Sequence, residues 1–327
     1  MTQSTSPSRF SHRSVLANEA PEALVHDPDG VYVDATFGRG GHSRTILGKL
    51  SEKGRLIAFD RDPEAVAAAS AITDPRFSIV HSAFSAMSEE LSARGVHAVD
   101  GILMDIGVSS PQIDDPERGF SLRADGPLDM RMDTSRGMTA AEWIGHASAR
   151  EISEALKTYG EERFAGRIAQ AIVRERESHP ITRTAQLAEL IARSVPRNQH
   201  DPRQNPATRS FQAIRIVVNG ELDELSAALE SAGGLLREDG RLVVISFHSL
   251  EDRLVKRFFE LGAHPERGID QRVALRASEM PLPWWKSVTR VKPGREECDE
   301  NPRSRSAVMR WAARTARDWA ERREVDR

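Results

Sequence analysis

The sequence has a single cysteine and no long hydrophobic run, and both absences exclude whole classes of protein. Because Cys298 stands alone, an internal disulfide and a cysteine-based metal site are excluded. No apolar stretch approaches the roughly 18 residues that span a bilayer, and residues 1–14 lack the apolar core of a secretion signal. We therefore expect a cytoplasmic protein with no membrane partner, and we assign it no metal site.

Acidic and basic residues nearly balance over the whole chain. The 327 residues carry a formal net charge of −3, which excludes a protein that binds polyanions over its entire surface. Basic charge is concentrated between Arg163 and Arg215, where the chain has ten arginines and four acidic residues. Any contact with nucleic acid would therefore use a local patch. With 39% hydrophobic residues, the chain can bury a sizeable core, and its length fits about two domains.

Short β-branched segments alternate with helical patterns in the first hundred residues. The predicted strands are 31–36, 55–60, 77–82 and 100–107. Strands separated by helices indicate a parallel sheet, and ligands of such sheets bind at the carboxyl ends of the strands. A further buried strand is predicted at 240–248 and a closing strand at 307–313. We therefore predict an α/β fold with a site at that edge of the sheet.

The middle of the chain has a different pattern. Residues 108–136 are rich in Gly, Pro and Asp and are too long for a plain connection, which predicts a functional loop. Residues 139 to about 200 show only helical periodicity. One long helix is predicted over about 207–236, and Ser249 with Asp252 predicts a capping box at the start of the helix after it.

Candidate cofactor residues follow the first two predicted strands. Asp34 ends the first strand, and Gly40, Gly41 and His42 lie between it and a helix. Asp60 ends the second strand, where a carboxylate can accept hydrogen bonds from ribose hydroxyls. The pattern fits both NAD and S-adenosylmethionine. The third glycine of the dinucleotide fingerprint is absent, however, and the charge of Asp34 favours a sulfonium over a pyrophosphate, so S-adenosylmethionine is preferred.

The next two strands extend this edge. Phe84 follows the third strand, and Asp105 ends the fourth. Each residue also has a structural explanation, since Phe84 can belong to the core, Asp60 can cap the next helix, and His42 can cap the helix that it precedes. Their order on four successive strand ends favours a shared site.

Several long segments carry a resemblance to a known family. They are FGRGGHS (37–43), FDRDP (59–63), DIGVSSPQID (105–114), RGFS with DGPLDMRMD (118–133), YGEERFAGRIAQAIV (159–173), ATRSFQAIRIVVNGEL (207–222), SFHSLEDRLVK (246–256) and NPRSRSA (301–307). On these motifs, and over nearly its whole length, the chain resembles the RsmH/MraW family of cytosine-N4 methyltransferases that act on small-subunit ribosomal RNA.

The resemblance implies a fold and a division into domains. The fold is that of a class I S-adenosylmethionine-dependent methyltransferase, a Rossmann-like α/β sheet with an inserted all-helical domain. On this basis, the methyltransferase domain comprises residues 1–136 and 201–327, and the helical domain comprises residues 137–200.

The resemblance also implies an activity and a set of site residues. The activity is S-adenosylmethionine-dependent methylation of N4 in a cytidine of 16S rRNA, cytidine 1402, in the decoding region of the 30S subunit. Together with Asp34, the expected methyl-donor contacts are Gly40, Gly41, His42, Asp60, Phe84, Asp105 and Gln112. The expected catalytic groups, which hold the amine, are Asp105, Ser109 and Ser110. The expected RNA contacts are Arg118, Arg131, Arg303 and Arg305.

Two other functions stay open on the sequence alone. The glycine-rich turn and Asp60 also suit a nicotinamide-dependent oxidoreductase on the same fold. The basic insertion also suits a non-catalytic rRNA-binding assembly factor. Pairing of two copies as a homodimer is a further open alternative.

Overall fold

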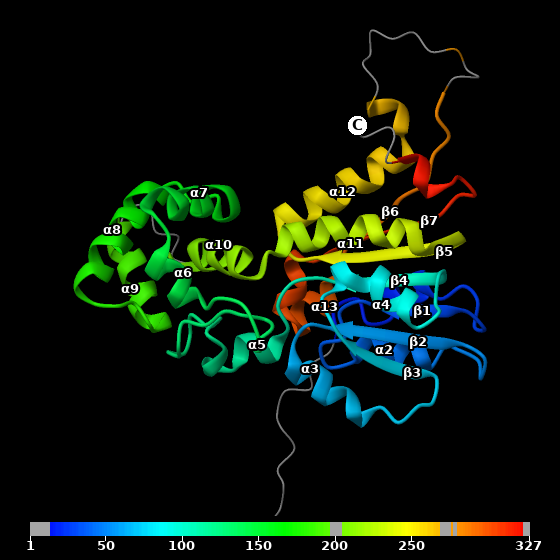
Figure 1. Cartoon of the computed structure of the whole chain (residues 1–327), viewed down its shortest axis with the longest axis horizontal. Coiled ribbons are helices and arrows are strands. Elements are labelled where there is room, and N and C mark those ends of the chain that lie inside the picture. Colours follow the sequence, from blue (N-terminus) through cyan, green and yellow to red (C-terminus); the bar gives the residue numbers. More distant parts are fainter. Residues whose placement is uncertain (1–13, 197–204, 269–275, 277–279, 323–327) are drawn as a thin grey trace, which may run out of the picture.

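The structure, a computed structural model, describes residues 14–196, 205–268, 276 and 280–322 (Figure 1). Its centre is a seven-stranded sheet with the order β3-β2-β1-β4-β5-β7-β6. The strands are β1 (Val31–Asp34), β2 (Arg55–Asp60), β3 (Phe77–His81), β4 (Val99–Asp105), β5 (Leu236–Ser246), β6 (Thr289–Val291) and β7 (Val308–Ala313). Strands β1 to β5 pair in parallel, whereas β7 is antiparallel to both β5 and β6. The predicted α/β fold is confirmed.

Helices cover both faces of the sheet, because side chains that alternate along each buried strand point to opposite faces. On β4, Ile102 and Met104 belong to a core with helices α4, α11 and α12, whereas Leu103 belongs to a core with α1 and α2. The helices of this part are α1 (Glu19–Leu24), α2 (Gly41–Leu47), α3 (Pro63–Ala68), α4 (Met87–Ala93), α11 (Glu221–Leu235), α12 (Ser249–Ala263) and α13 (Arg295–Glu300).

A separate hydrophobic core lies among the helices in the middle of the chain, on the left in Figure 1. These helices are α6 (Ala140–His146), α7 (Ala149–Gly160), α8 (Ala165–Ser178), α9 (Thr184–Ser194) and α10 (Thr208–Asn219). The helical pattern predicted from residue 139 onward is thus confirmed. This core extends from Leu128 to Ile214, beyond both predicted limits of 137 and 200, and the predicted boundary at 200 lies outside the described residues.

The single helix predicted over 207–236 is wrong. Gly220 has a φ of 60° and separates α10 from α11, because the left-handed backbone ends α10 and starts a new direction. The break separates the helical core from the sheet, since α10 packs on α7 and α11 packs on the sheet.

Asn219 joins the helical core to the loop before it. Its amide donates hydrogen bonds to the carbonyl oxygens of Met130 (2.8 Å) and Arg215 (2.9 Å), and its side-chain oxygen accepts one from the amide of Met132 (2.8 Å). Arg61, which follows β2, donates a hydrogen bond to the Asn219 carbonyl at 3.0 Å. The side chain of Asn219 therefore joins α10 to the 118–133 loop, and its backbone carbonyl joins both to the β2 end.

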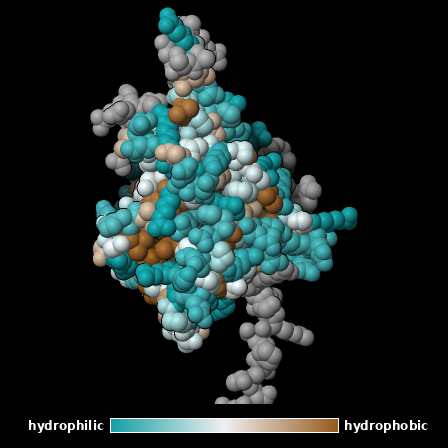
Figure 2. All heavy atoms as spheres, turned by 90° about the vertical axis from the view of Figure 1, so that its right-hand side faces the viewer, coloured by the Kyte–Doolittle hydropathy of each residue, from teal (hydrophilic) through white to brown (hydrophobic). Residues whose placement is uncertain are grey.

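The surface is largely polar. Figure 2 shows a mostly hydrophilic face with small, separate hydrophobic patches. Among the described helices, none combines the length and apolar character needed to cross a membrane.

We expect Leu103→Ala to lower the free energy of unfolding by about 2–5 kcal/mol, because Leu103 is fully buried in β4 and its loss leaves a cavity. Leu282→Ala is the matched control, since Leu282 is 70% exposed, and we expect a change within about 0.5 kcal/mol. Urea denaturation followed by circular dichroism measures both. Equal effects of the two substitutions would contradict the assignment of β4 to the centre of the core.

Candidate active site

A cavity of about 430 Å³ lies where the carboxyl ends of the parallel strands meet. Residues that follow β1, β2, β4 and β5 line it, together with parts of α10, α11 and the 301–306 segment. Its volume is in the range that holds a nucleoside-sized ligand. The predicted position of the site, at this edge of the sheet, therefore has a cavity.

The turn after β1 needs glycine for two reasons. Gly38 and Gly40 have φ values of 57° and 75°, in the left-handed region that side chains disfavour. A Cβ on Gly41 would overlap the Ser14 hydroxyl, and one on Gly40 would meet the Phe37 ring at 2.7 Å. Gly41 lines the cavity, whereas Gly40 lies behind it and shapes the turn as the N-cap of α2.

Asp60 faces the cavity from the end of β2. Its carboxylate accepts hydrogen bonds from the amides of Gly38 (2.7 Å) and Asp62 (2.8 Å). Burial raises the pKa of Asp60 to about 6, although these two hydrogen bonds oppose the shift. The cap of α3 is Asp62, whose carboxylate accepts from the amide of Glu64 at 3.0 Å, so the alternative role of Asp60 as that cap is excluded.

His42 and Asp105 form a pair on the cavity wall. Nε2 of His42 lies 3.3 Å from Oδ2 of Asp105, and the His42 side chain is only 4% exposed. Oδ1 of Asp105 is buried and accepts no hydrogen bond from the described residues. Burial alone would lower the pKa of His42, but the carboxylates of Asp105 and Asp34 outweigh it and raise the pKa. His42 lies inside α2, so it does not cap that helix.

The structure corrects the direct cofactor contact predicted for Asp34. This side chain is fully buried and does not line the cavity. It accepts hydrogen bonds from Oγ of Ser43 (2.6 Å) and from the amide of Thr36 (3.2 Å). Burial raises the pKa of Asp34 against the effect of Ser43. Asp34 therefore fixes the turn that carries the cavity residues, one layer behind them.

The structure also corrects the RNA contact predicted for Arg118. Its side chain is 5% exposed and donates hydrogen bonds to Asp62 (2.9 Å) and to the carbonyl oxygens of Arg131 (3.2 Å) and Met132 (3.0 Å). Gln112 donates to the same Asp62 oxygen at 2.8 Å. Arg118 thus anchors the 118–133 loop beside Asp60 and is shielded from any RNA.

The remaining loop residues are placed as follows. Ser109 caps α5 (Ser110–Asp114) through a capping box with Gln112, whose side-chain oxygen accepts from the Ser109 amide at 2.9 Å. Ser109, Ser110 and Gln112 line the cavity, and Ser110 is buried. Phe84 also lines the cavity while packing against the main core, so it is placed where a ligand could contact it, and that contact stays a prediction.

The other three predicted RNA contacts differ in exposure. Arg131 is held by Asp129 through two hydrogen bonds of 2.8 Å, which leaves it 21% exposed. Arg303 lines the cavity rim and pairs with Asp114 at 2.6 Å. Arg305 is exposed and donates to the Cys298 carbonyl at 3.2 Å. Of these three, only Arg303 lines the cavity and is thus within reach of a ligand at the rim.

The opposite wall of the cavity carries a charged network that the sequence did not predict. Arg215 donates two hydrogen bonds to Glu221 (2.8 and 2.9 Å), and Nε2 of His248 lies 3.0 Å from Glu251. Glu251 also accepts from the amide of Phe247 at 2.8 Å. Burial alone would raise the pKa of Glu251, but His248 and Arg215 outweigh it and lower the pKa.

The predicted capping box of α12 is wrong by one residue. His248 is the N-cap and Glu251 its partner, in place of Ser249 and Asp252. The spacing of three residues fits either pair, so the sequence alone did not decide between them. Ligand atoms of Glu221, His248 and Glu251 lie close enough for a metal ion, but Arg215 already neutralises Glu221.

A family model described as the MraW methylase family matches residues 9–315. The chain belongs to the MraW methylase family. Two curated relatives are both named ribosomal RNA small subunit methyltransferase H. The one from Chromobacterium violaceum is 58% identical over 95% of this chain and 98% of the relative, and the one from Burkholderia thailandensis is 56% identical over 93% and 98%. These findings confirm the resemblance.

A solved structure described as a putative rRNA methylase from Clostridium thermocellum aligns with a TM-score of 0.41 and 11% identity, over 94% of this chain and 98% of that one. That likeness is too weak to carry an argument. The methylase fold, a class I sheet, is confirmed by MraW family membership together with the seven-stranded α/β sheet itself.

We expect Arg118→Met to lower the free energy of unfolding by about 3–5 kcal/mol, because it leaves the buried carboxylate of Asp62 without its cation. Arg123→Met is the control, since Arg123 is exposed in the same loop, and its expected change is within about 0.5 kcal/mol. Urea denaturation compares them. Wild-type stability of Arg118→Met would instead favour an RNA contact.

Proposed function

We propose that the protein transfers a methyl group from S-adenosylmethionine to N4 of a cytidine in 16S rRNA, cytidine 1402, within the 30S subunit. Three features support the proposal: membership of a methylase family, the names of the curated relatives, and a cavity lined by the carboxylates of Asp60 and Asp105. The observation that carries it is the carboxylate of Asp105, which lines this cavity, is 21% exposed and is paired with the buried His42.

The residues of the cavity fit an adenosine-containing sulfonium compound. The carboxylate of Asp60 is held by two backbone amides, which leaves its other lone pairs for the two ribose hydroxyls. Phe84 supplies an aromatic surface beside it, and the backbone from Gly38 to His42 closes one side of the cavity. When bound, S-adenosylmethionine supplies an electrophilic methyl group on a positively charged sulfur. Nearby carboxylates favour that charge, whereas they disfavour the pyrophosphate of a nicotinamide cofactor.

Asp105 is the residue that prepares the amine. The lone pair of a cytosine N4 is conjugated with the ring, so the amine attacks only if its hydrogens are held out of that plane. The carboxylate of Asp105, whose Oδ2 lies 3.3 Å from Nε2 of His42, accepts one N4 hydrogen. As the N–CH₃ bond forms and the S–CH₃ bond breaks, Asp105 takes the proton that nitrogen releases. Ser110 lines the same wall, and Ser109 caps the loop that presents it.

The target base must leave its stack to enter such a cavity. Arg303 at the rim is placed to meet a phosphate beside it, and Arg305 follows two residues later. Up to roughly 7–11 kcal/mol of barrier reduction comes from alignment of two reactants, so the weak basicity of a carboxylate is sufficient.

We expect Asp105→Asn to lower kcat by about 10²–10⁴, because an amide accepts no proton and misdirects the amine. Tritium transfer to 30S subunits that lack the modification measures the rate, and mass spectrometry identifies the methylated nucleoside. Asp223→Asn, an exposed aspartate on α11, is the control with unchanged kcat. No N4-methylcytidine from the wild type would overturn the proposed activity, and full activity of Asp105→Asn would overturn the role of Asp105.

We expect the affinity for S-adenosylmethionine to rise between pH 5 and pH 7 and then level off. The pKa of Asp60 is raised to about 6, and the ribose hydroxyls bind its ionised form, which is depleted about tenfold one pH unit below the pKa. Calorimetric titration over this range measures the dependence, and Asp60→Asn should bind more weakly with no such step. NADH is the competing ligand: its micromolar binding, without binding of S-adenosylmethionine, would favour the oxidoreductase.

A further inference from the structure

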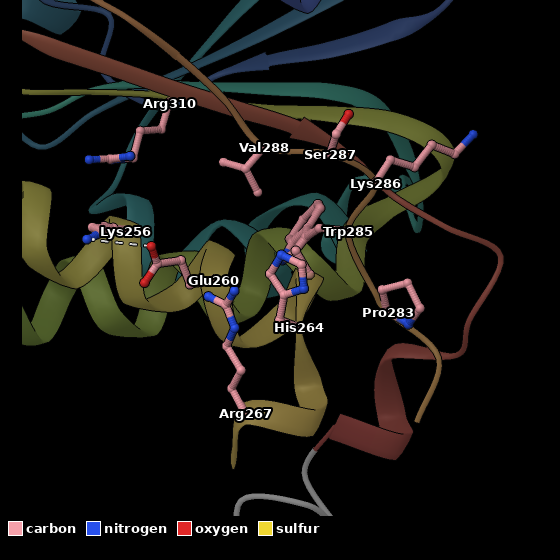
Figure 3. Close-up of a pocket in the computed structure, with 11 residues that line it drawn as sticks. Lys256, Glu260, His264, Arg267, Pro283, Trp285, Lys286, Ser287, Val288 and Arg310 are labelled. Atoms are coloured by element: carbon pink, nitrogen blue, oxygen red, sulfur yellow. Dashed lines mark ion pairs between the residues drawn. The ribbon is translucent and has the colours of Figure 1, made fainter. Parts of the chain in front are cut away.

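We call the cavity of about 430 Å³ in the candidate active site the reaction cavity. Helix α12 connects it to a second cavity. His248, its N-cap, and Glu251, in its first turn, line the reaction cavity. The last turns of α12 line another cavity of about 550 Å³, which lies between this helix and the segment before β6 (Figure 3). The helix has 15 residues and is about 22 Å long, the length of about six stacked nucleotides at roughly 3.4 Å each.

One side of this helix is basic. A stripe begins at Arg253 and includes the residues three, four, seven and eleven positions further on, which are Lys256, Arg257, Glu260 and His264. At 100° per residue, these positions share a face about 100° wide. We call these five residues the α12 stripe. Its three cations are exposed. Its single acid, Glu260, lies 3.5 Å from Lys256.

The neighbouring helix shows that this charge is specific to α12. Helix α11 packs beside α12 and has the same length, but it contains four acidic residues and neither lysine nor arginine. The two helices lie on the same face of the sheet (Figure 1). Basic charge on this face is therefore concentrated along one path, which starts at the reaction cavity.

The path continues at both ends. At the start of α12, the carboxylate of Glu161 lies 3.4 Å from Arg253, and its carbonyl accepts from Arg209 of α10 at 3.4 Å. At the other end, Arg267 is exposed and makes no ion pair with another described residue. Figure 3 shows Arg267 beside Glu260 and His264 on the helical side of the second cavity, with Lys286 and Arg310 on the strand side.

The acidic partners on this path do not exclude a polyanion. Arg310 is held by Asp252 through two hydrogen bonds and is buried, so it stays structural. The pairs Lys256 with Glu260 and Arg253 with Glu161 are about half exposed or more, and such surface pairs contribute little energy. A phosphate group, which accepts several charge-assisted hydrogen bonds, replaces such a partner readily.

We propose that the α12 stripe, with Arg267 at its end, binds the phosphate backbone of the RNA strand that flanks the target nucleotide. This inference rests on the proposed rRNA substrate and names the surface that holds it. When the target base is everted into the reaction cavity, the RNA strand that carries it stays outside, at the N-terminus of α12. The strand then follows the helix toward the second cavity, with its phosphates on the basic side chains.

The test is the triple variant Arg253→Gln, Lys256→Gln and Arg257→Gln, because glutamine preserves helix propensity while removing charge. Fluorescence anisotropy measures its affinity for a single-stranded RNA of about 12 nucleotides over a series of salt concentrations. We expect the slope of log affinity against log salt to fall by about 2, since each phosphate contact with a single strand contributes about 0.7. Arg267→Gln alone should lower it by about 0.7.

The control triple, Lys53→Gln, Arg55→Gln and Arg94→Gln, removes three exposed cations at the start of β2 and the end of α4, outside the α12 stripe, and should leave the slope unchanged. In methyl transfer to 30S subunits, the α12 triple should raise KM for the subunit about tenfold, with kcat and the affinity for S-adenosylmethionine unchanged. The unchanged affinity for S-adenosylmethionine also shows that the variant is folded.

Each other outcome has a separate meaning. An unchanged RNA affinity and salt slope in the α12 triple overturns this inference, whatever the activity. Loss of binding to 30S subunits with normal binding to free RNA also overturns it, and would assign the stripe to a protein partner. Absence of methyl transfer by the wild type would overturn the proposed function alone, since RNA binding still decides the role of the stripe.

Discussion

The structure depends on carboxylates that are removed from water at one edge of the sheet. Asp34, Asp60 and Asp105 end three neighbouring parallel strands, so their charges are brought together by the topology. Each buried charge needs donors, and the fold supplies them locally: Ser43 for Asp34, the turn amides for Asp60, and His42 for Asp105. Only Asp60 and Asp105 reach the cavity, and their remaining acceptor positions are what a ligand can use.

The same requirement extends to the loop that borders the cavity. Asp62 lies two residues after Asp60 and is buried, so it needs a cation from elsewhere, and Arg118 supplies it. Because Arg118 also holds the carbonyl oxygens of Arg131 and Met132, one ion pair fixes both ends of the loop that follows α5. Asn219 then joins that loop to the helical core. The geometry of the cavity is therefore linked to the position of the helices through a chain of buried polar contacts.

The sequence predicted the strands, the helical region and the edge of the sheet where residues gather, because these follow from local periodicity. It did not predict which charged residues are buried. Arg118 and Arg303 have similar surroundings in the sequence, yet the first is buried by Asp62, 56 residues away, while the second lies at the rim. The sequence also did not predict the ion pair of Arg215 with Glu221. These two residues lie on either side of Gly220, where the periodicity predicted one continuous helix and the structure has a break. The sequence placed Asp34 at the correct edge of the sheet. It did not predict that Asp34 is fully buried, where its carboxylate accepts a hydrogen bond from Ser43 across the turn.

The distribution of charge around the cavity resolves a physical conflict. A cavity rich in carboxylates suits a positively charged sulfonium but repels the phosphates of an RNA. The two demands are compatible only if the base enters while its backbone stays outside, on a surface of opposite sign. Glu221 and Glu251 on the inner wall have Arg215 and His248 as partners, which limits the negative potential that reaches the rim. Outside, the cations of α12 begin within one turn of that wall. In the proposed function, this change of sign over a short distance lets one helix serve both the reaction cavity and the RNA strand that delivers the base.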